Sequence, residues 1–243
     1  MYGNQNFSRK GTETLSGLHV DQEAVNALLA RVFNWMAIGL CLTGFAAFLT
    51  ASSPYLLQII FGNKAIFLGL IVVELCIVFY LSARVHKLSP QTATGIFIGY
   101  AILNGLTIAA IFLLYTMSSI ASTFFITAGM FGAMAIYGRV TKRDLTGLGS
   151  FMIMGLFGII IASVVNIFMQ SSELAWITSG IGVIVFTGLT AYDVQKIARI
   201  GASGIMQQGE AAIQRTAIMG ALSLYLDFIN LFLSLLQLMG NRR

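Results

Sequence analysis

Residues 224–232 near the end of the chain read LYLDFINLF and place Asp227 inside an apolar run. A carboxylate at the centre of a helix in lipid costs roughly 2.5–3.5 kcal/mol. The run from Ala217 to Met239 is long enough to cross a bilayer as a helix. The sequence therefore predicts a transmembrane helix whose aspartate faces protein or water.

The same segment carries a polar stripe. Its members recur every three or four positions, which places them on one face of a helix: Gly220, Ser223, Asp227, Asn230, Ser234 and Gln237. Because lipid does not accommodate such a face, we expect the other helices to surround this one. A hydrogen-bonded bundle core also explains Ser223, Asn230 and Ser234. It explains Asp227 poorly, because an asparagine would serve packing at lower cost.

The composition is that of an integral membrane protein. Of 243 residues, 57% are hydrophobic and 9% are charged, whereas soluble domains carry about 25% charged residues. Continuous apolar stretches favour helices over barrel strands, in which apolar and polar residues alternate. The formal charge of +5 comes mostly from basic residues that flank these stretches. We assign it to membrane topology and expect no nucleic-acid partner.

Seven spans are predicted behind a polar cytoplasmic tail, residues 1–30, with a short amphipathic entry at about 25–33. Residues 31–243 then form a transmembrane domain with spans at about 33–50, 65–83, 91–115, 120–137, 148–169, 174–192 and 217–239. Pro90 is placed to open the third span, since proline tolerates the first turn of a helix. A long link is expected between the last two spans, residues 198–216.

Basic residues predict the orientation. With the N-terminus inside, eleven of those flanking the spans lie on the inner side and three on the outer side. Seven crossings put Arg242 and Arg243 outside, against this rule. A re-entrant last segment would return them to the inside. We favour seven full crossings, because the last run is long enough to span.

Asp193 is the second candidate site residue. It ends the sixth span, three residues before Lys196, and a helix-end ion pair with Lys196 explains it when it is considered alone. If the sixth helix continues to Ile200, however, Asp193 and Asp227 differ in depth by one helical turn or less. A facing pair of carboxylates is then allowed.

Two more charges lie on the second span. Glu74 is inside it, and Arg84 follows ten residues later on roughly the same face. Arg84 either extends to the lipid headgroups or reaches a carboxylate on a neighbouring helix. Asn104 and Thr107 of the third span are interpreted as interhelical hydrogen-bonding groups.

Small residues four positions apart predict close helix contacts. These pairs are Gly95/Gly99, Ala128/Gly132 and Gly129/Ala133.

Two motifs carry a resemblance to a known family. Residues 188–196 read GLTAYDVQK and residues 222–232 read LSLYLDFINLF; residues 122–134 and 141–145 add to the match. In these motifs the chain resembles the Bax inhibitor (transmembrane Bax-inhibitor-motif) family, most closely its bacterial YccA-like branch. The resemblance covers essentially everything after Ala30.

This resemblance implies an all-α fold in which six transmembrane helices surround a central seventh. It also implies a pH-sensitive calcium leak of the bacterial inner membrane, controlled by a hydrogen-bonded dyad of Asp193 and Asp227. Arg84 is the best match for an arginine that latches onto the dyad. Glu74 matches an acidic residue of the ion pathway.

A mechanism follows as a hypothesis. Two close carboxylates in a low-dielectric site take up and release protons as a unit. At higher pH their charge would hold Arg84, and protonation would release it and open the leak. The oxygens of Asp193, Asp227 and Glu74 suit Ca²⁺, for which protons would compete. Ser223 and Asn230 would continue the pathway. We expect no cofactor. The expected partners are the lipid bilayer, Ca²⁺ and protons, and other membrane proteins such as a membrane protease are an alternative partner.

Two other functions remain open, and a third, proteolysis, is considered and set aside. A regulator or partner of other membrane proteins, such as a membrane protease, would act through residues 1–30. A proton-coupled carrier would exchange a saturable substrate. An intramembrane aspartyl protease would need Gly-x-Gly before Asp227 and a later Pro-Ala-Leu. The chain has neither, and its only prolines are Pro54 and Pro90. We therefore expect no enzyme.

Overall fold

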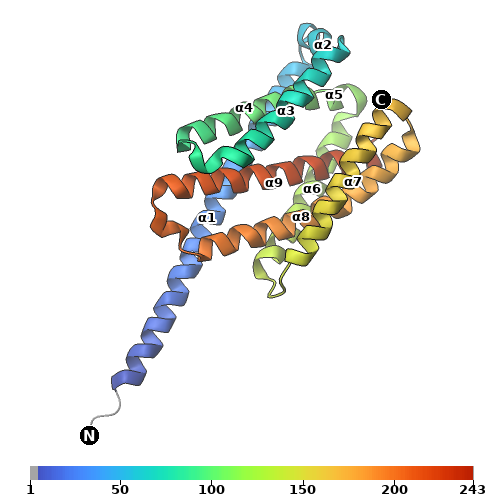
Figure 1. Ribbon diagram of the computed structural model, residues 1–243. Helices are drawn as coiled ribbons and strands as arrows, with labels where there is room; N and C mark the ends of the chain where they lie inside the picture. Colours follow the sequence, from blue (N-terminus) through green and yellow to red (C-terminus); the bar gives the residue numbers. More distant parts are fainter. Residues whose placement is uncertain (1–4, 243) are drawn as a thin grey trace.

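One helix, α9 (Glu210–Met239), runs through the centre of the bundle (Figure 1). This computed structural model describes the backbone of residues 5–242 and the side chains of residues 22–85 and 87–242. The other elements are α1 (Gln5–Ala51), α2 (Pro54–Phe61), α3 (Lys64–Arg84), η1 (Val85–Lys87), α4 (Pro90–Ile108), α5 (Ile111–Leu114), α6 (Met117–Val140), α7 (Thr146–Met169), α8 (Ser172–Ala202) and η2 (Ile205–Gln208).

The predicted all-α polytopic fold is confirmed. Seven helical segments of the described chain are long and apolar enough to cross a membrane: 22–51, 64–84, 90–114, 117–140, 146–169, 172–202 and 210–239. The described residues contain no strand, only an isolated bridge between Tyr115 and Arg242. Pro90 occupies the first turn of α4, as the sequence predicts, and Ser89 caps this helix.

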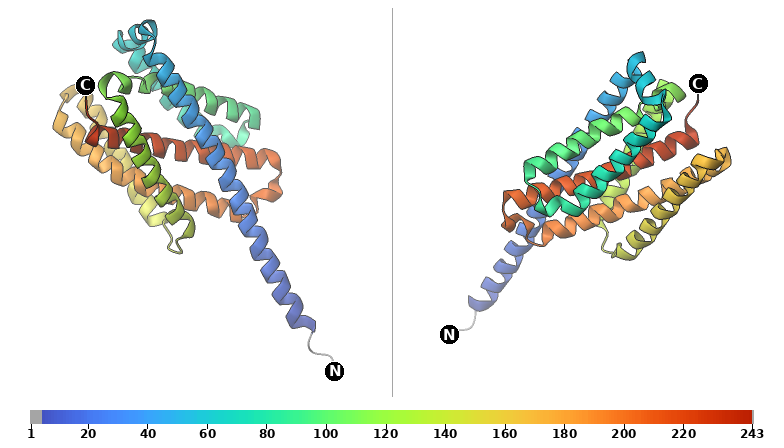
Figure 2. Two further views of the ribbon diagram at one scale, coloured as in Figure 1. Left: turned by 180° about the vertical axis from the view of Figure 1, so that it is seen from behind. Right: turned by 45° about the horizontal axis from the view of Figure 1, so that its top comes forward.

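Burial confirms that the seventh span is central. About two-thirds (67%) of the apolar window of α9 is buried, against 6% for α3 and for α7. α9 packs against α8, α1, α6 and α4, whereas α3 packs on α4 and α7 packs on α8 (Figure 2). Four of the six other spans therefore form the direct surroundings of α9, and two form an outer layer.

The N-terminal region differs from the expected tail. One continuous helix, α1, replaces the separate tail and first span, and it extends beyond the bundle (Figures 1 and 2). Its inner face begins well before the predicted span, because Val25, Leu28, Leu29 and Val32 are buried in the core. These residues are spaced three or four positions apart, so they form one apolar helix face that continues into the apolar run of the first span.

The expected long link between the last two spans is wrong. α8 continues to Ala202 and α9 begins at Glu210, which leaves a connection of residues 203–209. Residues 210–216 read EAAIQRT and consist mostly of good helix formers. The chain reverses at Gly204 and Gly209, whose φ angles of 79° and 86° favour glycine.

The last segment is not re-entrant in the described chain. α9 runs the full length of the bundle, and Asn241 just beyond it pairs with the α5–α6 turn. The Asn241 backbone N–H donates to Ser119 Oγ at 2.9 Å, and the Thr116 N–H donates to the Asn241 carbonyl at 3.1 Å. This turn and the start of α1 lie at opposite ends of the bundle (Figure 2).

Glycines do mediate close helix contacts, but not at the predicted positions. A Cβ added at Gly95, Gly99, Gly129 or Gly132 would meet no atom within 4 Å. At Gly138 of α6, by contrast, it would lie 2.2 Å from the Ala191 carbonyl oxygen of α8. Spacing alone does not distinguish a glycine in a helix contact from one that faces lipid.

We therefore expect Gly138→Ala to force α6 away from α8. Overpacking of this kind costs about 1–3 kcal/mol, so the apparent melting temperature in detergent should fall by several degrees. Gly132→Ala is the matched control on the same helix and should leave this temperature unchanged or slightly higher. Equal melting temperatures for the two variants would contradict the close α6–α8 contact.

Candidate functional site: a buried carboxylate pair on the central helix

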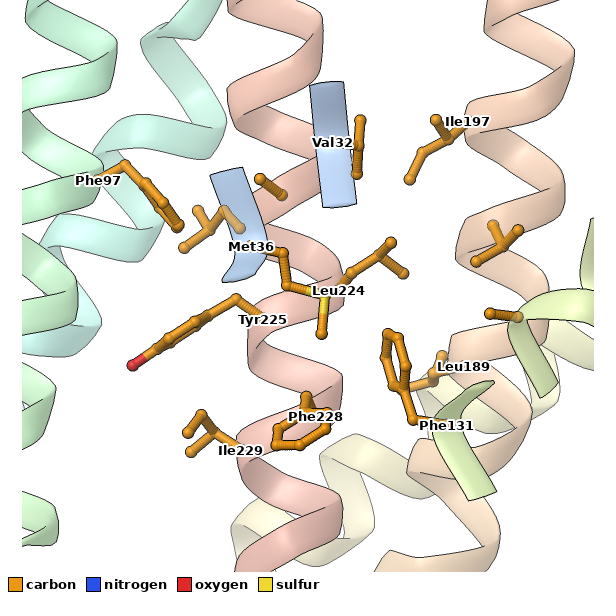
Figure 3. Packing of buried hydrophobic residues seen from close by; sticks show 14 of the residues in the cluster. Val32, Met36, Phe97, Phe131, Leu189, Ile197, Leu224, Tyr225, Phe228 and Ile229 are labelled. Atoms are coloured by element: carbon orange, nitrogen blue, oxygen red, sulfur yellow. The ribbon is translucent and has the colours of Figure 1, made fainter. Parts of the chain in front are cut away.

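Asp227 lies in the middle of the protein. Its residue is only 5% exposed, and its Oδ2 atom is buried without a hydrogen-bond partner. Apolar α9 side chains on the adjoining faces pack against other helices: Phe228 contacts Phe131 of α6, and Leu224 lies against Met36 of α1 (Figure 3). An unpaired polar atom in such a core is costly. This cost marks Asp227 as a functional candidate.

The structure brings Asp193 of α8 to Asp227, as the sequence analysis allowed. Asp193 is the charged group that acts on the Asp227 carboxylate. Ser223 of α9 faces Asp193 across the antiparallel α8–α9 contact. Since Asp227 is four residues beyond Ser223, the carboxylates are offset by about 6 Å along the helix axis. The described contacts include no hydrogen bond between the two carboxylates.

The alternative ion pair of Asp193 is not formed. Lys196 influences Asp193 electrostatically, but no described salt bridge joins them. The Lys196 side chain is exposed, and its Nζ lies 6.0 Å from the centre of the Tyr192 ring. Asp193 is therefore oriented toward Ser223 of α9 rather than paired with Lys196.

Glu74 belongs to a second polar group. Asn104 Nδ2 donates to Glu74 Oε2 at 3.2 Å, and Thr107 Oγ1 donates to Glu74 Oε1 at 2.8 Å. Tyr225 O–H donates to Asn104 Oδ1 at 2.9 Å, and Thr43 Oγ1 lies 2.6 Å from the Tyr225 oxygen. The chain of bonds links α1, α9, α4 and α3, with donors directed toward the Glu74 carboxylate.

This second group is separate from the carboxylate pair. Tyr225 and Asp227 are two residues apart on a helix, and their side chains point to different faces. Glu74 is held on the α4 side, away from Asp193 on α8. No cluster of three or more metal-ligating His, Cys, Asp or Glu side chains occurs in the described part of the chain. Glu74 therefore does not complete a calcium site with the two aspartates.

Arg84 is not brought to the carboxylate pair. It is exposed at the end of α3, which packs on α4 rather than on α8 or α9. No salt bridge of Arg84 occurs among the described side chains. The latch that the resemblance implies is absent from this conformation.

The loop next to Asp193 is fixed by polar contacts. Gln195 Oε1 accepts from the Leu145 N–H at 2.9 Å, and Arg199 Nη2 pairs with Asp144 Oδ1 at 2.6 Å. Hydrogen bonds from Thr146 and then from Arg199 hold the pKa of Asp144 well below its usual range. These contacts attach the α6–α7 loop to α8 one turn from the site.

Three participants escaped the sequence analysis. Tyr225 and Thr43 read as ordinary members of apolar runs, and their bond joins residues 182 positions apart. Thr187 has a buried hydroxyl oxygen without a partner. A single sequence offers no signal for such long-range partners.

Comparison with known proteins identifies relatives over nearly the whole chain. The family model described as inhibitor of apoptosis-promoting Bax1 matches residues 25–243. Inner membrane protein YbhL of Escherichia coli (strain K12) is 49% identical over 215 residues, which cover 88% of this chain and 92% of the relative.

Two more distant relatives extend the match. An uncharacterized protein of Borreliella burgdorferi is 46% identical over 218 residues, with 90% of this chain and 93% of the relative covered. An uncharacterized membrane protein of Streptococcus pyogenes is 36% identical over 219 residues, with 89% and 93% covered.

The second polar group yields a prediction. Tyr225→Phe removes the hydroxyl that joins Thr43 to Asn104, and unsatisfied buried groups cost about 1–3 kcal/mol. We expect a lower apparent melting temperature in detergent. Tyr80→Phe, at an exposed position of α3, is the control and should match the unmodified protein. A melting temperature of Tyr225→Phe equal to that of the control would show that the bond does not contribute to stability.

Proposed function

The chain belongs to the Bax inhibitor family, and on this premise we propose that it forms a pH-sensitive cation leak, with Ca²⁺ as the transported ion. The observation that carries the proposal is the buried Asp227 carboxylate, with one oxygen unpaired and Asp193 beside it. The name of the relative YbhL places that protein in the inner membrane, and we propose the same location here. The N-terminus is then cytoplasmic and the C-terminus lies on the opposite side.

The carboxylate pair is the pH switch. Two carboxylates in a low-dielectric site cannot easily both ionise, so their protonation is linked. Each proton taken up removes a charge from the α8–α9 contact. The pair therefore converts the proton concentration into a change of electrostatic force between the central helix and α8.

The contact between Ser223 and Asp193 gives the switch its direction. A hydrogen bond from a hydroxyl to an ionised carboxylate is about twice as strong as a neutral one. At higher pH such a bond from Ser223 to the Asp193 carboxylate would hold α8 to α9. Protonation of Asp193 weakens it and lets the helices separate. The leak opens as the pH falls, without a role for Arg84.

The stripe on α9 supplies the pathway. Ser223, Asn230, Ser234 and Gln237 continue from Asp227 in both directions along one face. Their oxygen atoms are the donor type that hard cations prefer. Protons and Ca²⁺ compete for the aspartate oxygens, so a high Ca²⁺ concentration should oppose acid opening.

A role as a partner of other membrane proteins is the second candidate. The observation that favours it is the extension of α1 beyond the bundle (Figure 1). Deletion of residues 1–21 would abolish a partner role but leave the leak intact, because the carboxylate pair and the α9 stripe lie elsewhere.

We expect Asp227→Asn and Asp193→Asn to abolish the pH dependence of the leak. The amide cannot change its charge, so the α8–α9 contact no longer responds to protons. The measurement is Ca²⁺ influx into proteoliposomes loaded with a calcium dye, from mildly alkaline to mildly acidic pH. The unmodified protein should show increasing influx toward the acidic side.

Asp144→Asn provides the control. Asp144 is exposed in the α6–α7 loop, and its lowered pKa keeps it ionised throughout this pH range. Its surface ion pair contributes little, so this variant should respond to pH like the unmodified protein. Unchanged influx and an unchanged pH response in Asp227→Asn would overturn the proposed function.

A further inference from the structure

A cavity of about 390 Å³ lies between α7, α8 and α9. Its lining contains no charged side chain. All three helices contribute hydroxyl or amide side chains to it: Ser163, Asn166, Ser179, Asn230, Ser234 and Gln237. Three of these belong to the polar stripe of α9, which thus faces a cavity along its last two turns.

Several polar atoms in the cavity lack a protein partner. Asn230 Nδ2 donates to the Leu226 carbonyl at 2.8 Å, which leaves Asn230 Oδ1 free to face the cavity. Ser163 and Ser234 form no hydrogen bond with other described residues. Polar groups at membrane depth need partners, and water supplies them where protein does not. At roughly 30 Å³ for each molecule, the volume of the cavity corresponds to about thirteen waters.

The cavity reaches the end of the bundle opposite the N-terminus. Asn166 is three residues before the end of α7, and Gln237 is two residues before the end of α9. The α7–α8 turn and the C-terminus lie at this end (Figure 2). Solvent on that side therefore has the shortest route into the cavity.

The other end of the cavity points toward the carboxylate pair. Asn230 is three residues from Asp227 on the same face, which is less than one helical turn. Ser234 lies directly over Gly182, and this register places Phe186 of α8, which also lines the cavity, level with Asn230. Asp227 Oδ2 and Thr187 Oγ1 are the two described buried side-chain atoms without a partner. Along α9, Asp227 lies between Asn230, which lines the cavity, and Ser223, which faces Asp193.

We propose that this cavity is a water-filled vestibule that admits protons and hydrated cations to Asp227 from the side opposite the N-terminus. The route for protons stands on the geometry alone, and the route for cations rests on the proposed function. The lining is neutral, whereas tight Ca²⁺ sites use carboxylates. The vestibule therefore passes hydrated cations without holding them, and the carboxylate pair responds to pH on that side.

Few charged groups lie close enough to Asp227 to affect its response to pH. Asp193 of α8 is the charged group that acts on Asp227, and Lys196 acts in turn on Asp193. From α1, α4 and α6, the described side chains bring no charge to it. Tyr225 of α9 is engaged with Thr43 and Asn104 on another face.

Two adjacent residues of α7 test the vestibule. Ser163 lines the cavity, whereas Val164, the next residue of α7, does not line it; both residues are exposed. Ser163→Cys and Val164→Cys are made in a chain whose own cysteines, Cys41 and Cys76, are replaced by alanine. A charged, membrane-impermeant thiol reagent is then added to one side of sealed vesicles at a time. Thiols react as thiolates, which form in water and not in lipid.

We expect Ser163→Cys to react at least ten times faster than Val164→Cys, from the side opposite the N-terminus. Ser234→Cys of α9 should behave like Ser163→Cys and serves as a second probe if one variant folds poorly. Equal rates for positions 163 and 164, or faster reaction from the N-terminal side, would overturn the vestibule.

The leak is measured separately on the same labelled protein. A charged adduct at position 163 should lower Ca²⁺ influx severalfold relative to the unlabelled protein. Fast labelling with no leak at any pH would support the vestibule and refute the proposed function. Slow labelling with a normal pH-dependent leak would refute the vestibule alone.

Discussion

The arrangement of the bundle depends on keeping the Asp227 carboxylate out of lipid. Its residue lies on a helix long enough to cross the membrane, so four other spans must cover that helix. The cost of the carboxylate is not fully removed, because one oxygen remains without a partner. A protein core that retains such a cost is suited to a change of protonation, which removes the charge of the carboxylate.

Two polar systems use opposite faces of the central helix. The carboxylate pair faces α8, while Tyr225 joins Asn104 and Glu74 on the α4 side. The first system is incompletely satisfied and can respond to protons. The second is a continuous chain of hydrogen bonds that fixes α9 against α1, α3 and α4. One face can thus rearrange while the other holds the central helix in place.

The sequence predicts the central helix well because its polar stripe is a local, periodic signal. It also places Asp193 at the right depth. It does not predict the partners of Glu74, which come from positions 30 and 33 residues away. Nor does it show that Arg84 is exposed and apart from the pair, since the neighbours of a helix face are not known from the sequence. The link between the last two spans is shorter than predicted, because the good helix formers of residues 210–216 extend α9 ahead of its apolar run.

Infrared spectroscopy of the carboxyl groups tests most directly whether Asp193 and Asp227 act as a unit. The carbonyl band of protonated Asp227, assigned by its loss in Asp227→Asn, is followed against pH. If the carboxylates share their protons, Asp193→Asn will shift the pH at which this band appears. A band that appears at the same pH with and without the Asp193 carboxylate would contradict the account.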